Sequence, residues 1–229
     1  MKSTAKTHRK IRTLLYTAAS FVLTFALFSS CTKDDDTKAE GTVEVMVVNA
    51  AEGSGSQDLY LDNSKITADA VAYSEHSSYI STRSGSRKAD FKASGSTEVT
   101  SSAQADLKPG KHYTIILKGG ASSKETIVTE DDLDNPPAGK AKVRCIHLSP
   151  LAPSVDIAVK NGASLFSSLG YGSVSQFTTV DAGVQNLHIS LTGNTALGID
   201  VPVTFEAGRI YTIWASGTSV LNAQVITNK

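Results

Sequence analysis

Apolar and polar residues alternate with a period of two in many short runs of this chain, which is the pattern of β-strands that bury one face. The clearest runs are Val43–Val47, Val155–Val159 and Leu187–Leu191. After Cys31, no stretch keeps the helical spacing of i, i+3, i+4 and i+7 for three turns. Candidate strands instead recur about every eight to twelve residues, so the sequence predicts an all-β protein.

Two local patterns refine this expectation. Val143 and Cys145 point to one face of a predicted strand, while Arg144 between them points to the other. Cys145 is then a small core residue, and no intrachain disulfide is expected. The dipeptide Asn161-Gly162 after the strand Val155–Val159 predicts a two-residue hairpin of type I′, in which both central residues have positive φ.

A long internal repeat connects these runs. Distinctive residues recur at one constant offset of 98 positions: Val45 and Val143, Asp58 and Asp156, Asn63 and Asn161, Tyr73 and Tyr171, and Gly85 and Gly183. Solenoid repeats have units of only about 20–50 residues, so a repeat of this length indicates two copies of a whole small domain.

The predicted fold is therefore two tandem immunoglobulin-like antiparallel β-sandwich domains after a lipoprotein signal peptide. A run of acids followed by Pro136-Pro137 is the predicted linker between the copies. The acidic side chains repel one another, the prolines stiffen the chain, and the Asn-Pro step favours a turn. The predicted segments are a signal peptide at 1–30, a flexible tether at 31–41, a first sandwich at 42–130, a linker at 131–139 and a second sandwich at 140–229.

The first thirty residues have the parts of an export signal. A basic start is followed by the apolar run Leu14–Phe28 and by the small residues Ser29 and Ser30. Cys31 follows at once, as in a bacterial lipoprotein, where this cysteine carries the lipid. The alternatives are a chance cysteine beside an ordinary cleavage site and a spanning helix, although the run is shorter than the roughly 20 apolar residues that spanning requires.

The residues behind Cys31 bear on location. Lys33 and the acids Asp34–Asp36 resemble the lipoprotein export signal of Bacteroidetes, which implies transport to the outer membrane and exposure at the cell surface. A solvated spacer is the alternative interpretation of this charge run, and it leaves a periplasm-facing protein open.

Composition excludes one class of partner. Apolar residues make up 40% of the chain and charged residues 19%, which is enough to bury an ordinary core in each copy. Five of the 22 basic side chains lie in residues 1–30, where there is no acid. The remaining 17 basic and 22 acidic side chains give a net charge of −5, so the exported part has no electrostatic footprint for nucleic acid.

The second copy carries a family resemblance. The string VRCIHLSPLAPSVDIAV at Val143–Val159, with Tyr171–Ser175 and Val180–Gly183, resembles domain of unknown function 4397, a family of exported β-sandwich domains. The resemblance implies a fold and an exported setting, and it implies no activity. The first copy departs from the pattern, because Asn49 stands where His147 does and Glu52–Gly55 replaces the proline corner.

The proline corner holds the only residues that suggest catalysis. His147, Ser149 and Asp156 are the residue types of nucleophilic hydrolysis, but they lack a nucleophile elbow and the first copy keeps only the aspartate. We therefore expect a structural role at a sandwich corner, with hydrogen bonds to loop backbone. The three residues remain the candidate loop site, and a hydrolase is the distant alternative.

Other chemistry has weak signals. The mature histidines are isolated, and the acids of the linker lack the spacing of a calcium loop, so no metal or cofactor is expected. Most aromatic residues recur in both copies, which favours packing over a sugar-stacking platform. The sequence predicts a non-catalytic binding or structural module that contacts the membrane through a lipid on Cys31, with a surface adhesin for a glycan or host protein as the alternative.

Overall fold

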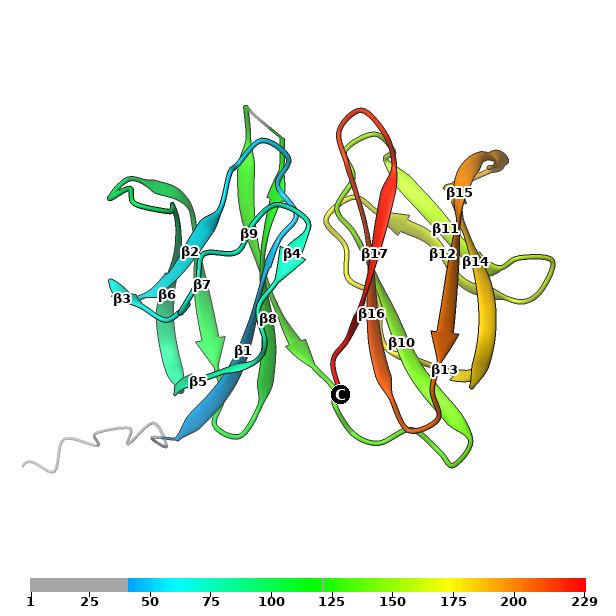
Figure 1. The fold of residues 1–229 in the computed structure, drawn as a ribbon, viewed down its shortest axis with the longest axis horizontal. Coiled ribbons are helices and arrows are strands. Elements are labelled where there is room, and N and C mark those ends of the chain that lie inside the picture. Colours follow the sequence, from blue (N-terminus) through cyan, green and yellow to red (C-terminus); the bar gives the residue numbers. More distant parts are fainter. Residues whose placement is uncertain (1–40, 121) are drawn as a thin grey trace, which may run out of the picture. The chain divides into compact units, whose positions relative to one another are not determined.

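The computed structural model describes residues 41–120 and 122–229, and these belong to one compact unit. The regular elements in these ranges are all β-strands, so the all-β prediction is confirmed (Figure 1). The described ranges accordingly contain no helix that is long and apolar enough to cross a membrane. The predicted signal peptide, Cys31 and nearly all of the predicted tether lie outside the described residues.

The first nine strands make two sheets, which we call the N-terminal half. Sheet A has the order β4-β1-β8-β9, with β5 also paired to β1, and sheet B has the order β3-β2-β6-β7. Their bounds are β1 Thr42–Asn49, β2 Gln57–Leu61, β3 Ser64–Lys65, β4 Glu75–His76, β5 Ile80–Arg83, β6 Gly85–Ala93, β7 Val99–Leu107, β8 His112–Gly119 and β9 Lys124–Asp131.

The remaining eight strands make the C-terminal half in the same way. Sheet C has the order β13-β10-β16-β17, and sheet D has the order β12-β11-β14-β15 (Figure 1). Their bounds are β10 Lys140–His147, β11 Ser154–Val159, β12 Ser164–Gly170, β13 Thr178–Asp181, β14 Gly183–Leu191, β15 Asn194–Phe205, β16 Ile210–Ser216 and β17 Asn222–Thr227.

The predicted sandwiches were antiparallel, and the structure departs from this at one parallel pair in each of sheets A and C. In sheet A, β1 runs parallel to β8, with Val45 opposite Tyr113. In sheet C, β10 runs parallel to β16, with Val143 opposite Tyr211. Alternation along a strand identifies its buried face but carries no information on the direction of its neighbour, so the sequence pattern does not reveal these parallel pairs.

Backbone conformation repeats at the offset seen in the sequence. Left-handed φ angles recur at residues 98 positions apart: Asn63 and Asn161, Ser74 and Gly172, Gly85 and Gly183, Gly95 and Gly193, Gly110 and Gly208, and Gly119 and Gly217. The predicted type I′ turn is nevertheless wrong, because only Asn161 of the Asn161-Gly162 pair has a positive φ, at 58°. The turn is one residue longer, with the Val159 amide donating to the carbonyl of Ala163.

Each half has its own apolar core, and a third apolar cluster joins them. Alternate residues of β1 and β8 face sheet B, and alternate residues of β10 and β16 face sheet D. The other faces of these four strands meet in a cluster that contains Met46, Val48, Ile116, Ile146 and Trp214. The central strands β1, β8, β10 and β16 are therefore buried on both faces over most of their length.

Candidate functional site

The proline corner follows β10 and is held by its own polar side chains. The Nε2 of His147 donates to the carbonyl of Ala152 at 2.9 Å, and the hydroxyl of Ser149 donates to the carbonyl of Gly217 at 2.6 Å. His147 and Ser149 are both fully buried. Burial lowers the pKa of His147, against a smaller opposing effect of the Ala152 carbonyl, so the ring is neutral at pH 7.

Asp156 has other hydrogen-bond partners than His147 and Ser149. Its Oδ1 accepts from the amide of Ser168 at 2.7 Å and from the hydroxyl of Thr192 at 3.1 Å. The structure thus gives each of the three sequence-predicted site residues a separate partner, and among the described contacts no hydrogen bond joins any two of them. A base must lie within hydrogen-bond reach of its nucleophile, so this arrangement does not activate Ser149.

The N-terminal half builds the equivalent corner with Asn49. Its Nδ2 donates to the carbonyls of Gly55 at 2.8 Å and Val71 at 3.1 Å. Its Oδ1 accepts from the amide of Ala51 and the hydroxyl of Ser54. Asn49 is also fully buried, so the two halves use different side chains for the same task of fixing the chain after the first strand.

A buried ion pair that the sequence analysis missed joins sheets A and C. Nη2 of Arg144 lies 2.6 Å from Oδ1 of Asp131, and the exposed fractions of the two side chains are 1% and 0%. Arg144 was predicted only to point away from the core, and Asp131 was assigned to the linker, whereas it is the last residue of β9. Periodicity gives the face of Arg144 but not whether a second sheet covers that face.

Hydroxyl groups from both halves complete this pair. The Nε of Arg144 donates to the hydroxyl oxygen of Thr212 at 2.9 Å, and its Nη2 donates to that of Thr114 at 3.1 Å. Asp131 Oδ2 accepts from the hydroxyls of Thr114 at 2.7 Å and Tyr79 at 2.6 Å. Such a network satisfies two charges that burial would otherwise destabilise.

Equivalent surfaces of the two halves meet at this contact. Thr114 and Thr212 are 98 positions apart, and both contact the guanidinium of Arg144. The apolar cluster contains further pairs with the same separation, namely Val48 with Ile146, Ala50 with Leu148, and Ile116 with Trp214. The contact resembles an interface between two like subunits, in which the same patch is used by each partner.

A polar cavity of about 670 Å³ opens beside the ion pair. Buried Asp131 and Asn228 line it together with Tyr79, and the rim includes Lys111 and His112. The amide nitrogen of Asn228 donates to the Tyr79 hydroxyl at 3.2 Å, and the rings of Tyr79 and His112 meet edge to face with centroids 5.3 Å apart. Burial and the Asp131 carboxylate raise the pKa of Tyr79 far above its usual range.

Most charged groups at this cavity have charged partners, while Lys229, which also lines it, donates to the carbonyl of Leu133 at 3.0 Å. Lys111 lies 3.0 Å from Glu130 and Lys142 lies 2.7 Å from Asp132. A hydrogen bond from Lys111 lowers the pKa of Glu130, and one from Lys142 lowers that of Asp132, so both carboxyls are ionised at pH 7. No sequence motif marks the cavity, because its residues come from separate places: the residue before β5, the turn into β8 and its first residue, the end of β9 with the segment after it, and the two residues after β17.

The metal-ligating side chains and the free thiol of residues 41–120 and 122–229 have the following surroundings. In these ranges no group of three His, Cys, Asp or Glu side chains is placed to hold a metal ion. Asp131, Asp132 and Asp134 were the linker acids weighed as calcium ligands, and the first two are engaged by Arg144 and Lys142. Burial raises the pKa of Cys145 to about 12, so this thiol is protonated and unreactive.

Two solved structures are similar to this chain at low identity. The carbohydrate-binding module CBMbc (family CBM26) from Eubacterium rectale Amy13K, solved in complex with maltoheptaose, is 12% identical over 80% of this chain and 96% of its own, with a TM-score of 0.27. The Bacillus anthracis TIE protein is 9% identical over 77% of this chain, which covers 34% of that protein, with a TM-score of 0.25. We infer neither ligand nor activity from these likenesses.

Sequence comparison gives one match. No curated protein matches the chain. The family model of the domain of unknown function DUF4397 matches residues 43–158, from β1 to within β11. The family resemblance is confirmed, but the match lies mainly in the N-terminal half and shares only residues 143–158 with the strings that suggested it. Because the match spans just over half of its length, the chain belongs to the DUF4397 family.

Proposed function

We propose that this chain is a lipid-anchored, non-catalytic binding or structural module of the cell envelope, attached to the outer membrane through Cys31 and exposed at the cell surface. One observation carries the non-catalytic part. His147 and Ser149 are buried and donate to the carbonyls of Ala152 and Gly217, so the residues best suited to hydrolysis hold a loop in place instead.

The anchoring part rests on the sequence of the first 36 residues. A basic start, an apolar run and small residues precede Cys31, and the charge pattern after it resembles the Bacteroidetes export signal. A periplasm-facing position is the alternative location. The hydrolase alternative loses support from the separate partners of His147, Ser149 and Asp156.

A surface adhesin for a glycan or host protein is the second candidate function. The polar cavity beside Tyr79 favours it, since its volume of about 670 Å³ lies within the range of small-molecule sites, about 300–1,000 Å³. The second usual feature of a glycan site, a platform of several exposed aromatic rings, is not found among the described residues. Of the large apolar and aromatic side chains that are exposed among the described residues, Tyr171 is the only ring, and Lys118 lies over it at 4.2 Å.

Protease shaving of intact cells tests location and anchoring together. We expect the mature domains to disappear from a blot of shaved wild-type cells. A Cys31→Ala variant should lose membrane attachment and fractionate with soluble proteins. Protection of the wild-type protein until the outer membrane is opened would contradict surface exposure, and unchanged membrane attachment of the variant would contradict the lipid anchor.

A further inference from the structure

Two of the polar side chains that line the cavity are buried. Asp131 and Asn228 line it and are 4% and 7% exposed. Both are fixed by other side chains, since Asp131 is paired with Arg144 and the Oδ1 of Asn228 accepts from the Thr212 hydroxyl at 2.6 Å. Polar groups that are held in place before a ligand arrives lower the entropic cost of binding.

Three of the four acidic side chains that line the cavity are ion-paired, which disfavours a charged ligand at these three. Each carboxylate of Glu130, Asp131 and Asp132 is paired with a basic side chain at 3.0 Å or less. A bound cation would compete with Lys111 or Lys142 for these carboxylates, and a bound anion would compete with the carboxylates for the lysines. A neutral ligand leaves the ion pairs intact and avoids this competition.

The same groups retain hydrogen-bonding capacity. A carboxylate accepts about four hydrogen bonds, so Glu130 and Asp132 keep free acceptor positions beside their lysine partners. The amide nitrogen of Asn228 has two donor hydrogens, and one is used on Tyr79. The rings of Tyr79 and His112 add an apolar patch to this polar wall.

We propose that this cavity, lined by Tyr79, His112, Glu130, Asp131 and Asn228, binds a neutral polyhydroxylated ligand, namely a saccharide unit. Hydroxyl groups both donate and accept, which matches the mixture of carboxylate, amide and ammonium groups in the lining, and the C–H face of a sugar suits an aromatic ring. This inference rests on the proposed function of a binding module and specifies the ligand class of one site.

The test is amide NMR of the full-length chain in a zwitterionic detergent, titrated with glucose, galactose, N-acetylglucosamine and their neutral disaccharides. We expect at least one of these sugars to shift the amides of Lys111, His112 and Asp134. In Glu130→Gln and in His112→Ala, the affinity for that sugar should fall roughly three- to tenfold, as for a lost hydrogen bond or ring contact.

Asp200→Asn is the matched control, because Asp200 is also a carboxylate paired with a lysine, Lys160, but belongs to β15. Its affinity should stay within about twofold of the wild type. The proposal fails if no sugar shifts the cavity amides, if the shifts lie elsewhere, or if acetate or methylammonium shifts them more strongly at equal concentration. If no sugar binds at the cavity but the shaving experiment shows surface exposure, the saccharide proposal is refuted and the proposed surface module stands.

Discussion

The two halves place different residues at matching positions of the surfaces by which they meet. Met46 of the N-terminal half lies 98 positions before Arg144, and Ile116 lies 98 positions before Trp214. Met46, Ile116 and Trp214 belong to the shared apolar cluster, whereas Arg144 forms the buried ion pair. The difference teaches that a nearly repeated surface carries an apolar residue in one half and a buried charge in the other, and the buried charge requires a partner at one place on the opposite surface.

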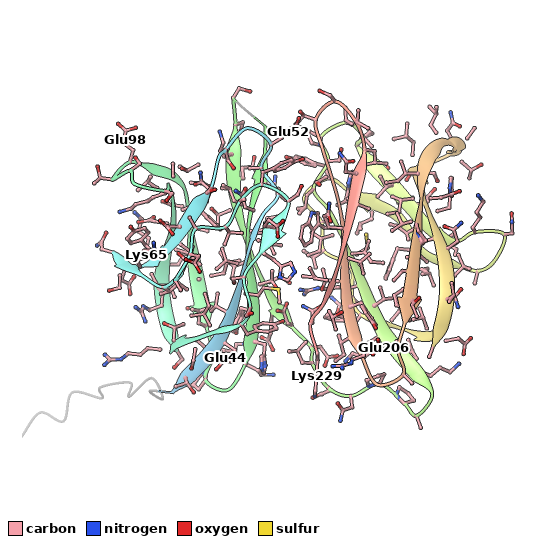
Figure 2. All side chains as sticks on the ribbon, in the orientation of Figure 1. Glu44, Glu52, Lys65, Glu98, Glu206 and Lys229 are labelled. Atoms are coloured by element: carbon pink, nitrogen blue, oxygen red, sulfur yellow. The ribbon has the colours of Figure 1, made fainter. Side chains whose placement is uncertain are left out.

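The largest effect is expected when Arg144 is replaced by methionine, the residue at the matching position of the N-terminal half. Arg144→Met should reduce the free energy of unfolding by about 3–5 kcal/mol, because it leaves the Asp131 carboxylate buried without its partner. Urea unfolding followed by circular dichroism measures this loss. Figure 2 shows the side chains of both halves on the ribbon.

A second variant separates the lost pair from a general packing defect. Adding Asp131→Asn to Arg144→Met removes the orphaned charge but keeps an acceptor for Tyr79 and Thr114, so most of the stability should return. If Arg144→Met alone stays within about 1 kcal/mol of the wild type, the ion pair is not desolvated and the comparison between the halves loses its basis.

A smaller effect is expected at the two corners. Asn49→Ala should cost about 2–3 kcal/mol and His147→Ala about 1–2 kcal/mol, because Asn49 bonds Gly55, Val71 and Ala51 while His147 bonds only Ala152 among the described residues. His147→Asn, which copies the N-terminal residue, should cost less than His147→Ala. Urea midpoints of the three variants check the order, and a larger loss for His147→Ala than for Asn49→Ala would reverse it.

The smallest effect concerns pH and two matching pairs of cross-strand neighbours. His188 lies opposite Asp200 in β14 and β15, and Asp90 lies opposite Ser102 in β6 and β7, at matching positions of the halves. Both ring nitrogens of His188 lie 2.8 Å from acceptors, Oδ1 of Asp200 and the carbonyl of Thr195, so both donate only when the ring is charged.

These contacts give the halves opposite responses to pH. The hydrogen bond to Asp200 raises the pKa of His188 above 6.5, so its stabilisation is full below pH 6.5 and is lost as pH rises through the raised value. Burial opposes ionisation of Asp90, but hydrogen bonds from Ser102 and Lys88 outweigh it and lower its pKa below 3.8. The stabilisation by Asp90 is present above pH 3.8 and is lost as pH falls through the lowered value.

Amide hydrogen exchange, corrected for the intrinsic effect of pH, measures this contrast. Protection of β14 and β15 should fall between mildly acidic and alkaline pH, while that of β6 and β7 should not. His188→Gln should remove the pH response of β14 and β15. Substitution of Lys160, which also pairs with Asp200, should leave that response in place. An equal response of both hairpins in the wild type would contradict the assignment to His188.

The sequence predicted the strands and buried faces well because alternation is a local property. Val143, Cys145 and Ile157 face the core of the C-terminal half as the period of two requires. The role of Arg144 was not predictable, because nothing in its own strand reveals the sheet that covers it. The cavity was missed for a related reason, since Tyr79, Glu130 and Asn228 become neighbours only after strands far apart in the chain come together.

The single tryptophan of the chain gives the contact between sheets A and C an optical reporter. Trp214 is 1% exposed within the shared apolar cluster, and its indole ring meets His76 of the N-terminal half edge to face at 6.4 Å. We therefore expect its emission to be blue-shifted while the two halves remain in contact and to move to longer wavelength when water enters between them. A red shift of this emission on heating would therefore report separation of the halves, and circular dichroism recorded alongside it would report loss of the strands.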